Sequence, residues 1–117
     1  MRLLMRGQQT GWTDELRRHA ERRVHFALSR FSPSIGLVTV DLRDSLTAPD
    51  DLDRTCRIVV QLVPSGSVLV EETQKDISSA IDQAAECAGR AVGRALERER
   101  DWEADPKQPK ATRVPKL

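Results

Sequence analysis

Asp76-Ile77-Ser78-Ser79-Ala80-Ile81-Asp82 joins a strand-like run, Val68 to Val70, to a long stretch with helical periodicity. Asp76 is a favourable N-cap residue, because its carboxylate can accept hydrogen bonds from the free amides of the first helical turn. Apolar and small residues then recur on one helical face as far as about residue 100: Ile77, Ala80, Ile81, Ala84, Ala88, Val92 and Ala95. This pattern predicts a long C-terminal helix that begins at residue 76.

The segments that precede this helix have the alternation of strands. Val38, Val40 and Leu42 alternate with more polar residues, and the same pattern runs from Thr55 to Leu62. Each run predicts a strand with one apolar face. Pro64-Ser65-Gly66-Ser67 supplies turn residues for a hairpin into a further strand, from residue 68 to about 73. Residues 44–53 are polar and acidic and include a proline, so we expect a loop there.

The N-terminal part predicts one strand and one helix. Leu3 and Met5 alternate with other residues, and Gly7 ends this run. Thr13 is a good N-cap and is followed by two acidic residues. Apolar residues then continue at helical spacing: Leu16, Ala20, Val24, Ala27, Leu28 and Phe31. We therefore expect a helix over about residues 14–31, ended by Ser32-Pro33.

The predicted order is β-α-β-β-β-α, and the predicted fold class is α+β. A two-layer sandwich follows, with a four-stranded sheet and both helices on one of its faces. Because the first helix connects two strands by a right-handed crossover, we expect these strands to be parallel and the others to form an antiparallel meander. The domain is expected to cover residues 1–102. Residues 103–117 are rich in proline and lysine and are expected to form a disordered tail.

Composition excludes several classes of function. No apolar run approaches the length of a membrane span, and the apolar segment between Arg2 and Arg6 is too short for a secretory signal. We therefore expect a cytoplasmic protein without a membrane partner. Cys56 and Cys87 fall inside a strand and a helix pattern, which favours two free thiols. No residue spacing indicates a metal site, a cofactor, a small-molecule substrate or an enzyme.

The arginines provide a candidate nucleic-acid interface, although the formal net charge is only +1. Helical spacing places one cationic set opposite the apolar stripe of the first helix and a second set along one side of the last helix. If the helices pack side by side, both sets face the same way. The candidate RNA-binding residues are Arg18, Arg22, Arg23, Arg30, Lys75, Arg90, Arg94 and Arg98. A solvated face with local ion pairs, such as Glu86 with Arg90, is the alternative interpretation.

Three features resemble the ribosome hibernation-promoting factor and ribosome-associated inhibitor family, which includes sigma-54 modulation proteins. They are the element order, the opening Gly7-Gln8-Gln9 followed by Thr13-Asp14-Glu15-Leu16, and the segment Asp76 to Asp82. The resemblance covers about residues 2–100. It implies a fold similar to a double-stranded-RNA-binding domain and a protein that binds the small ribosomal subunit and its rRNA near the decoding channel. Such a protein would inhibit translation during stress or stationary phase.

The resemblance further implies a short form, because residues 101–117 are too few for the second, dimerising domain of long family members. A second hypothesis belongs to a different class: a protein-interaction module that kept the fold and lost RNA affinity. It would pair with itself, as a possible homodimer, or with another protein. Trp12, Phe26 or a groove at Gly89 and Gly93 would then form the contact.

Overall fold

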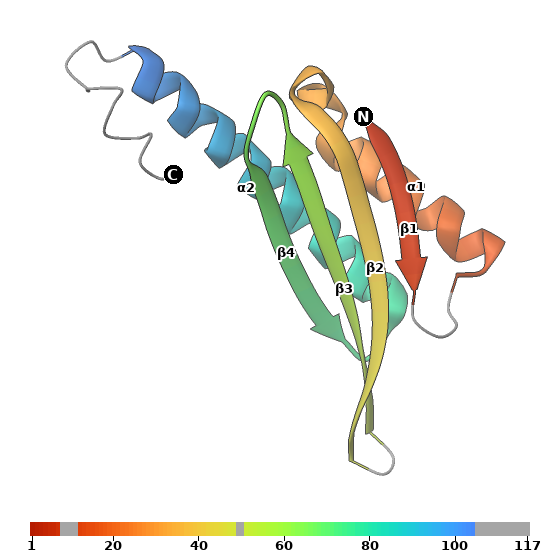
Figure 1. Cartoon of the computed structure of the whole chain (residues 1–117). Helices are drawn as coiled ribbons and strands as arrows, with labels where there is room; N and C mark the ends of the chain where they lie inside the picture. The colour runs from red at the N-terminus through yellow and green to blue at the C-terminus, as the bar shows by residue number, and fades with distance from the viewer. Residues whose placement is uncertain (8–11, 49–50, 105–117) are drawn as a thin grey trace.

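The computed structural model describes residues 1–7, 12–48 and 51–104. Elements follow in the order β1 (Arg2–Gly7), α1 (Asp14–Leu28), a short 3-10 helix η1 (Ser29–Ser34), β2 (Ile35–Ala48), β3 (Asp51–Leu62), β4 (Ser67–Gln74) and α2 (Ile77–Ala104) (Figure 1). The predicted β-α-β-β-β-α order is thus confirmed. Gln8 and Gln9, which contributed to the family resemblance, lie outside the described residues.

The four strands form one mixed sheet in the order β1-β2-β3-β4. β1 pairs with β2 in parallel, with Leu3 opposite Val38. β2 with β3 and β3 with β4 are antiparallel pairs. A parallel neighbour requires a crossover between the strands, and α1 supplies it. The predicted topology is therefore confirmed strand by strand.

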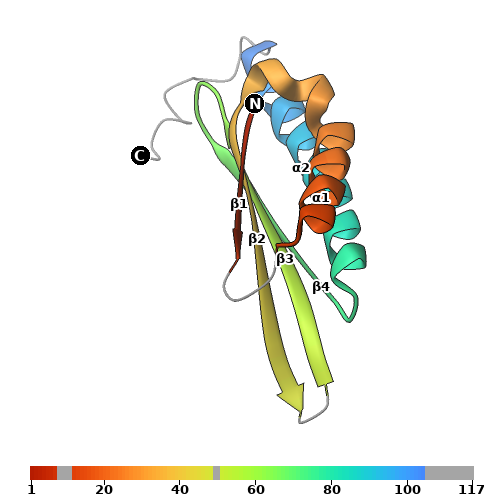
Figure 2. The same ribbon diagram turned by 90° about the vertical axis from the view of Figure 1, so that its right-hand side faces the viewer.

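Both helices cover the same face of the sheet, and the opposite face is open along the described strands (Figure 2). The core lies between these two layers, and its largest buried side chains are Val24, Leu28, Val38, Val40, Ile58, Val60, Ile81 and Val92. In the strands, the buried residues alternate with outward-facing ones, as the period of two requires. Because α1 and α2 turn their apolar stripes to the sheet, their polar sides are available to solvent.

The acidic segment 44–53 is not the loop that its composition suggested. β2 continues to Ala48 and β3 starts at Asp51, with Asp44 opposite Arg54 and Leu46 opposite Leu52. Figure 1 shows this hairpin extending beyond the rest of the sheet. An ion pair of 3.7 Å joins Asp44 to Arg54. The expectation failed because the strand register places Asp44 opposite Arg54, the residue that directly follows the acidic segment. Residues 49 and 50 lie outside the described residues.

The ends of the helices differ slightly from the predicted bounds. α1 ends at Leu28, and the chain tightens into η1, which contains Pro33. Proline has no amide hydrogen to donate, so a short 3-10 segment replaces the expected last turn of the α-helix. α2 runs to Ala104, which includes the first two residues of the expected tail. Residues 105–117 of that tail lie outside the described residues.

Candidate nucleic-acid interface

α1 and α2 pack closely at Gly89. Gly89 is buried, and a β-carbon added there would lie 3.0 Å from the carbonyl oxygen of Ala27. Four residues on, a β-carbon at Gly93 would lie 3.3 Å from a ring carbon of Phe31. These glycines therefore permit the two helices to approach closely.

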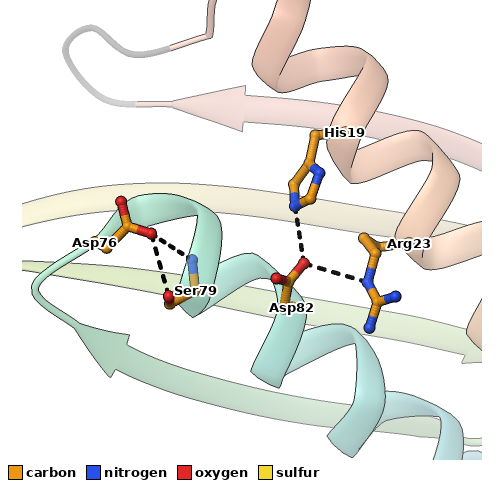
Figure 3. A network of polar contacts seen from close by, with 5 residues as sticks. All are labelled: His19, Arg23, Asp76, Ser79 and Asp82. Atoms are coloured by element: carbon orange, nitrogen blue, oxygen red, sulfur yellow. Dashed lines mark hydrogen bonds and ion pairs between the residues drawn. The ribbon is translucent and has the colours of Figure 1, made fainter.

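A single carboxylate also joins the two helices. Nε2 of His19 lies 2.8 Å from Oδ1 of Asp82, and Nε of Arg23 lies 3.2 Å from the same oxygen (Figure 3). The side chain of His19 is only 26% exposed, because it has a partner on α2. Helical spacing along α1 gave no sign of a partner 63 residues away.

The start of α2 is capped as predicted. Oδ2 of Asp76 accepts hydrogen bonds of 3.1 Å from both the amide and the hydroxyl of Ser79 (Figure 3). The equivalent cap on α1 is Thr13, whose hydroxyl accepts from the Leu16 amide at 3.0 Å. Both caps satisfy amides that have no partner inside the helix. They determine where each helix begins, and so the register of the arginines along it.

A concave band runs along the outer side of the two helices. We call it the interhelical groove, and define it by the residues Arg23, Phe26, Ala27, Arg30, Phe31, Glu86, Gly89, Arg90, Gly93, Arg94, Leu96 and Glu97. A second hollow on α1 adjoins it and shares Arg23 and Phe26. The lining of this α1 hollow is Arg18, Glu21, Arg22, Arg23, His25, Phe26 and Ser29. Six of the eight candidate residues thus lie along one connected surface.

Four of the candidate arginines have free guanidinium groups. Within the described part of the chain, no ion pair or hydrogen bond engages the side chains of Arg18, Arg22, Arg94 or Arg98. Arg30 has a different neighbour, since its guanidinium carbon lies 4.7 Å from the ring centroid of Phe31. Such a cation over an aromatic face keeps its charge and its outward donors. These groups can therefore accept an anion without first losing a carboxylate.

Two groove arginines are already paired. Arg23 contacts Asp82, and Nη1 of Arg90 lies 3.5 Å from Oε2 of Glu86, one turn earlier on α2. The Arg90 pair is the local alternative that the sequence indicated. Both partners are more than half exposed, so the pair contributes little and can rearrange. Glu21 and Glu97 also line the surface, and they reduce its positive potential.

Two candidate residues stand apart from the groove. Nζ of Lys75 lies 2.7 Å from Oδ1 of Asp53, so this lysine neutralises the β2–β3 hairpin at the junction between β4 and α2. Arg98 is exposed on α2, one turn beyond Arg94, and lies outside the groove lining. Arg98 extends the arginine row of α2, whereas Lys75 already has a carboxylate partner.

Phe26 is the groove residue whose importance the sequence understated. Its side chain is 81% exposed, and it lines both the α1 hollow and the interhelical groove. The sequence indicated Phe26 only as one possible contact of a protein-interaction module. Trp12, in contrast, is half-buried, and its Nε1 donates to the carbonyl of Arg6 at 2.8 Å. Trp12 therefore secures the end of β1 instead of forming an open contact surface.

Neither cysteine lines the interhelical groove or the α1 hollow. Cys56 is fully buried under the helices, and Cys87 is half-buried on α2. Burial raises the pKa of Cys56 to about 12, with a smaller contribution from Asp41. Burial, followed by the hydrogen bond to Glu72, raises the pKa of Cys87. Both thiols are free, as predicted, and their raised pKa values disfavour the reactive thiolate.

The fold and the groove are those of a small α+β domain that presents arginines on its helical side. The chain belongs to the family described as "Sigma 54 modulation protein / S30EA ribosomal protein", because residues 3–100 match it. This is a family of non-enzymatic ribosome-associated factors, which agrees with the sequence-based expectation of a protein without catalytic activity. A comparison with curated protein sequences gave no significant match.

Two solved structures are similar to the whole domain. The N-terminal domain of Protein Y from Thermus thermophilus is 27% identical, with a TM-score of 0.65, and the match covers 80% of this chain and 98% of that one. A ribosomal subunit interface protein from Coxiella burnetii gives a TM-score of 0.64 at 16% identity, over 82% of this chain and 99% of that one. The second similarity concerns the fold alone. In the described residues, no helix has the length and apolar character needed to span a membrane.

Proposed function

We propose that this protein is a cytoplasmic translation inhibitor and hibernation factor, and that it binds small-subunit rRNA near the decoding channel during stress or stationary phase. Family membership supports a ribosomal partner. The helical side of the domain supplies the contact surface.

The observation that carries this proposal is the meeting of arginines from two distant segments in one groove. Arg23 and Arg30 come from α1 and η1, and Arg90 and Arg94 come from α2. Phosphate oxygens match the planar fork of a guanidinium group, and rows of arginines one helical turn apart can follow a nucleic-acid backbone. Each phosphate neutralised in this way releases a bound counterion, so the affinity should fall as salt rises.

Co-sedimentation with ribosomes tests the proposal. The full chain should migrate with the small subunit or with intact ribosomes at low salt, and should dissociate steeply as salt is raised. The triple variant Arg90→Ala, Arg94→Ala, Arg98→Ala should bind at least tenfold more weakly and show a smaller salt slope, because up to three phosphate contacts are lost. Among the described residues, Arg90 has a weak pair and the other two have none, so the fold should tolerate the change.

A matched control is available on the open face of the sheet. Arg2, Arg6 and Arg43 are neighbours of core-facing strand residues, so the alternation directs them away from the helices. Replacing these three by alanine removes the same net charge and should leave ribosome binding within about twofold. Equal losses in both triple variants would indicate a general charge effect and would contradict the proposed interface. Absence of ribosome association by the unaltered chain at low salt would contradict the function itself.

A second candidate function is supported by the acids of the groove. Glu21, Glu86 and Glu97 interrupt the arginines, and Phe26 exposes a large apolar side chain between them. A surface of mixed charge around an exposed aromatic also suits a protein partner or a second copy of this chain. A complex that survives nuclease and high salt would favour this interaction module. Loss of every partner after nuclease treatment would favour RNA.

A further inference from the structure

Phe26 is the most exposed of the large apolar side chains in the described residues. Its exposed fraction is 81%, and the next highest is 57%, for Leu69. α1 has a full apolar stripe of its own, with Ala20, Val24 and Leu28 buried against the sheet. Phe26 lies off that stripe and adds nothing to the core. Fold stability therefore gives no reason for an aromatic ring at this position.

Cations outnumber acids around the ring, although Glu21 and Glu86 line the same two hollows. Arg22 lies one helical turn before Phe26 on α1. Arg30 lies in η1 and lines the same groove as Phe26 and Arg23. The guanidinium carbon of Arg23 is 5.9 Å from the centroid of the Phe26 ring. The ring also lies where the α1 hollow meets the interhelical groove, since it lines both. Arginines on both sides could thus hold consecutive phosphates while the ring itself remains accessible.

We propose that Phe26 stacks on an unpaired base of the RNA bound in this groove. The interface then recognises looped or single-stranded RNA in preference to a continuous duplex. This inference rests on the proposed RNA-binding function and deepens it by naming the class of RNA. An aromatic ring accepts any base, because each base has a flat π face. In a regular A-form duplex the bases are stacked on each other and are not available to such a ring.

The alternative roles of an exposed aromatic lead to different expectations. A contact with a ribosomal protein would use Phe26 only when the whole ribosome is present. A self-association surface would bury the ring against a second copy and would need no RNA. A stacking role requires that the ring affect the binding of naked RNA, and that the effect depend on whether unpaired bases are present. This dependence can be measured.

The test compares two RNAs with equal numbers of phosphates: a fully paired duplex and a hairpin with an unpaired purine loop. Fluorescence anisotropy would give the affinity of the full chain and of its variants for each RNA. Phe26→Ala should bind the hairpin about 5- to 150-fold more weakly, the range for one stacked base, and the duplex as before. Phe26→Trp should restore hairpin binding. Leu69→Ala is the matched control, since Leu69 is 57% exposed on β4.

Each outcome decides for or against the inference. A selective loss of hairpin affinity in Phe26→Ala, with rescue by tryptophan, supports stacking. If the unaltered chain binds the hairpin no more tightly than the duplex, and Phe26→Ala has the same two affinities, the stacking inference is wrong. The proposed function is then unaffected. If Phe26→Ala loses ribosome association but not hairpin affinity, the ring contacts a protein and the inference is wrong. If the unaltered chain binds neither RNA nor ribosomes, the proposed function fails together with it. Thermal melting should show that Phe26→Ala remains folded, because the side chain is outside the core.

Discussion

His19 on α1 and Asp82 on α2 form a hydrogen bond of 2.8 Å across the interface of the two helices. An ionised carboxylate can only accept, so Nε2 of His19 must carry the proton. The same oxygen of Asp82 lies 3.2 Å from Arg23. One carboxylate thus determines how the first arginine of the interhelical groove is held relative to the second helix (Figure 3).

Replacement of Asp82 by alanine should lower the free energy of unfolding by about 0.5–1 kcal/mol, because a partly exposed pair contributes modestly. Urea denaturation at neutral pH measures this loss. Asp44→Ala is a suitable control, since Asp44 is about as exposed but has only a 3.7 Å ion pair to Arg54. Equal losses in the two variants would show that the contact between the helices adds nothing specific.

Gly89→Ala should destabilise the protein, although alanine is the better helix former. Helix propensity alone would add about 1 kcal/mol of stability. The new β-carbon would meet the backbone carbonyl of Ala27 at 3.0 Å, which cannot rotate away, so we expect a net loss of about 1–2 kcal/mol. Gly93→Ala is the control in the same helix, because its nearest contact is the movable ring of Phe31. A lower melting temperature for Gly93→Ala than for Gly89→Ala would contradict this packing argument.

Removal of the α2 cap should also be measurable. Asp76→Ala leaves the Ser79 amide without its 3.1 Å acceptor and should lower the free energy of unfolding by about 1 kcal/mol. Asp76→Ser supplies another capping oxygen and should recover most of this loss. Chemical denaturation of the three proteins tests the prediction. If alanine and serine behave alike at this position, the side-chain cap does not stabilise α2.

Cys56 makes stability depend on alkaline pH. Burial raises its pKa from 9.0 to about 12. Above pH 9 the unfolded chain therefore releases a proton that the folded protein retains, so the stability present below pH 9 is lost progressively as the pH rises toward 12. The slope for one group is at most about 1.4 kcal/mol per pH unit.

Denaturant unfolding between neutral pH and pH 10.5 measures this dependence, with Cys56→Val as the control that lacks the thiol. The chain contains no tyrosine to titrate in the same range. The difference in stability between the two proteins should shift in favour of the valine variant as the pH increases. A constant difference would mean that the Cys56 thiol is not protected by burial.

Local patterns predicted the elements of this fold with few errors. Alternation identified the strands and helical periodicity the two helices, because burial of one face leaves a period in the sequence. Thr13 and Asp76 marked the helix starts through the chemistry of capping. The extension of the β2–β3 hairpin through residues 44–53 was missed, because the acidic composition of this segment indicated a loop. Pairing of Asp44 with Arg54 depends on the register of the two strands. Pairing of Asp53 with Lys75 depends on a residue 22 positions away.

The candidate interface was predicted only in part. Arginines four residues apart on α2 must share one side of the helix, so this row followed from the sequence. The separation of Lys75 from the groove did not, since its partner Asp53 lies 22 positions earlier. The contacts of Asp82 with His19 and Arg23 could not be predicted from the sequence either. Such contacts depend on how α1 and α2 lie on the sheet.

The amino-acid sequence by itself determined the order of strands and helices, the parallel β1–β2 pair, the capping residues and the family to which the domain belongs. These properties arise from short-range periodicity, backbone chemistry and connection length. Only the tertiary structure decided which cations form one surface, which are neutralised by distant carboxylates, and where Phe26 lies among them. Close approach of Gly89 to Ala27 sets the distance between the helices, and that distance turns two separate arginine rows into one groove.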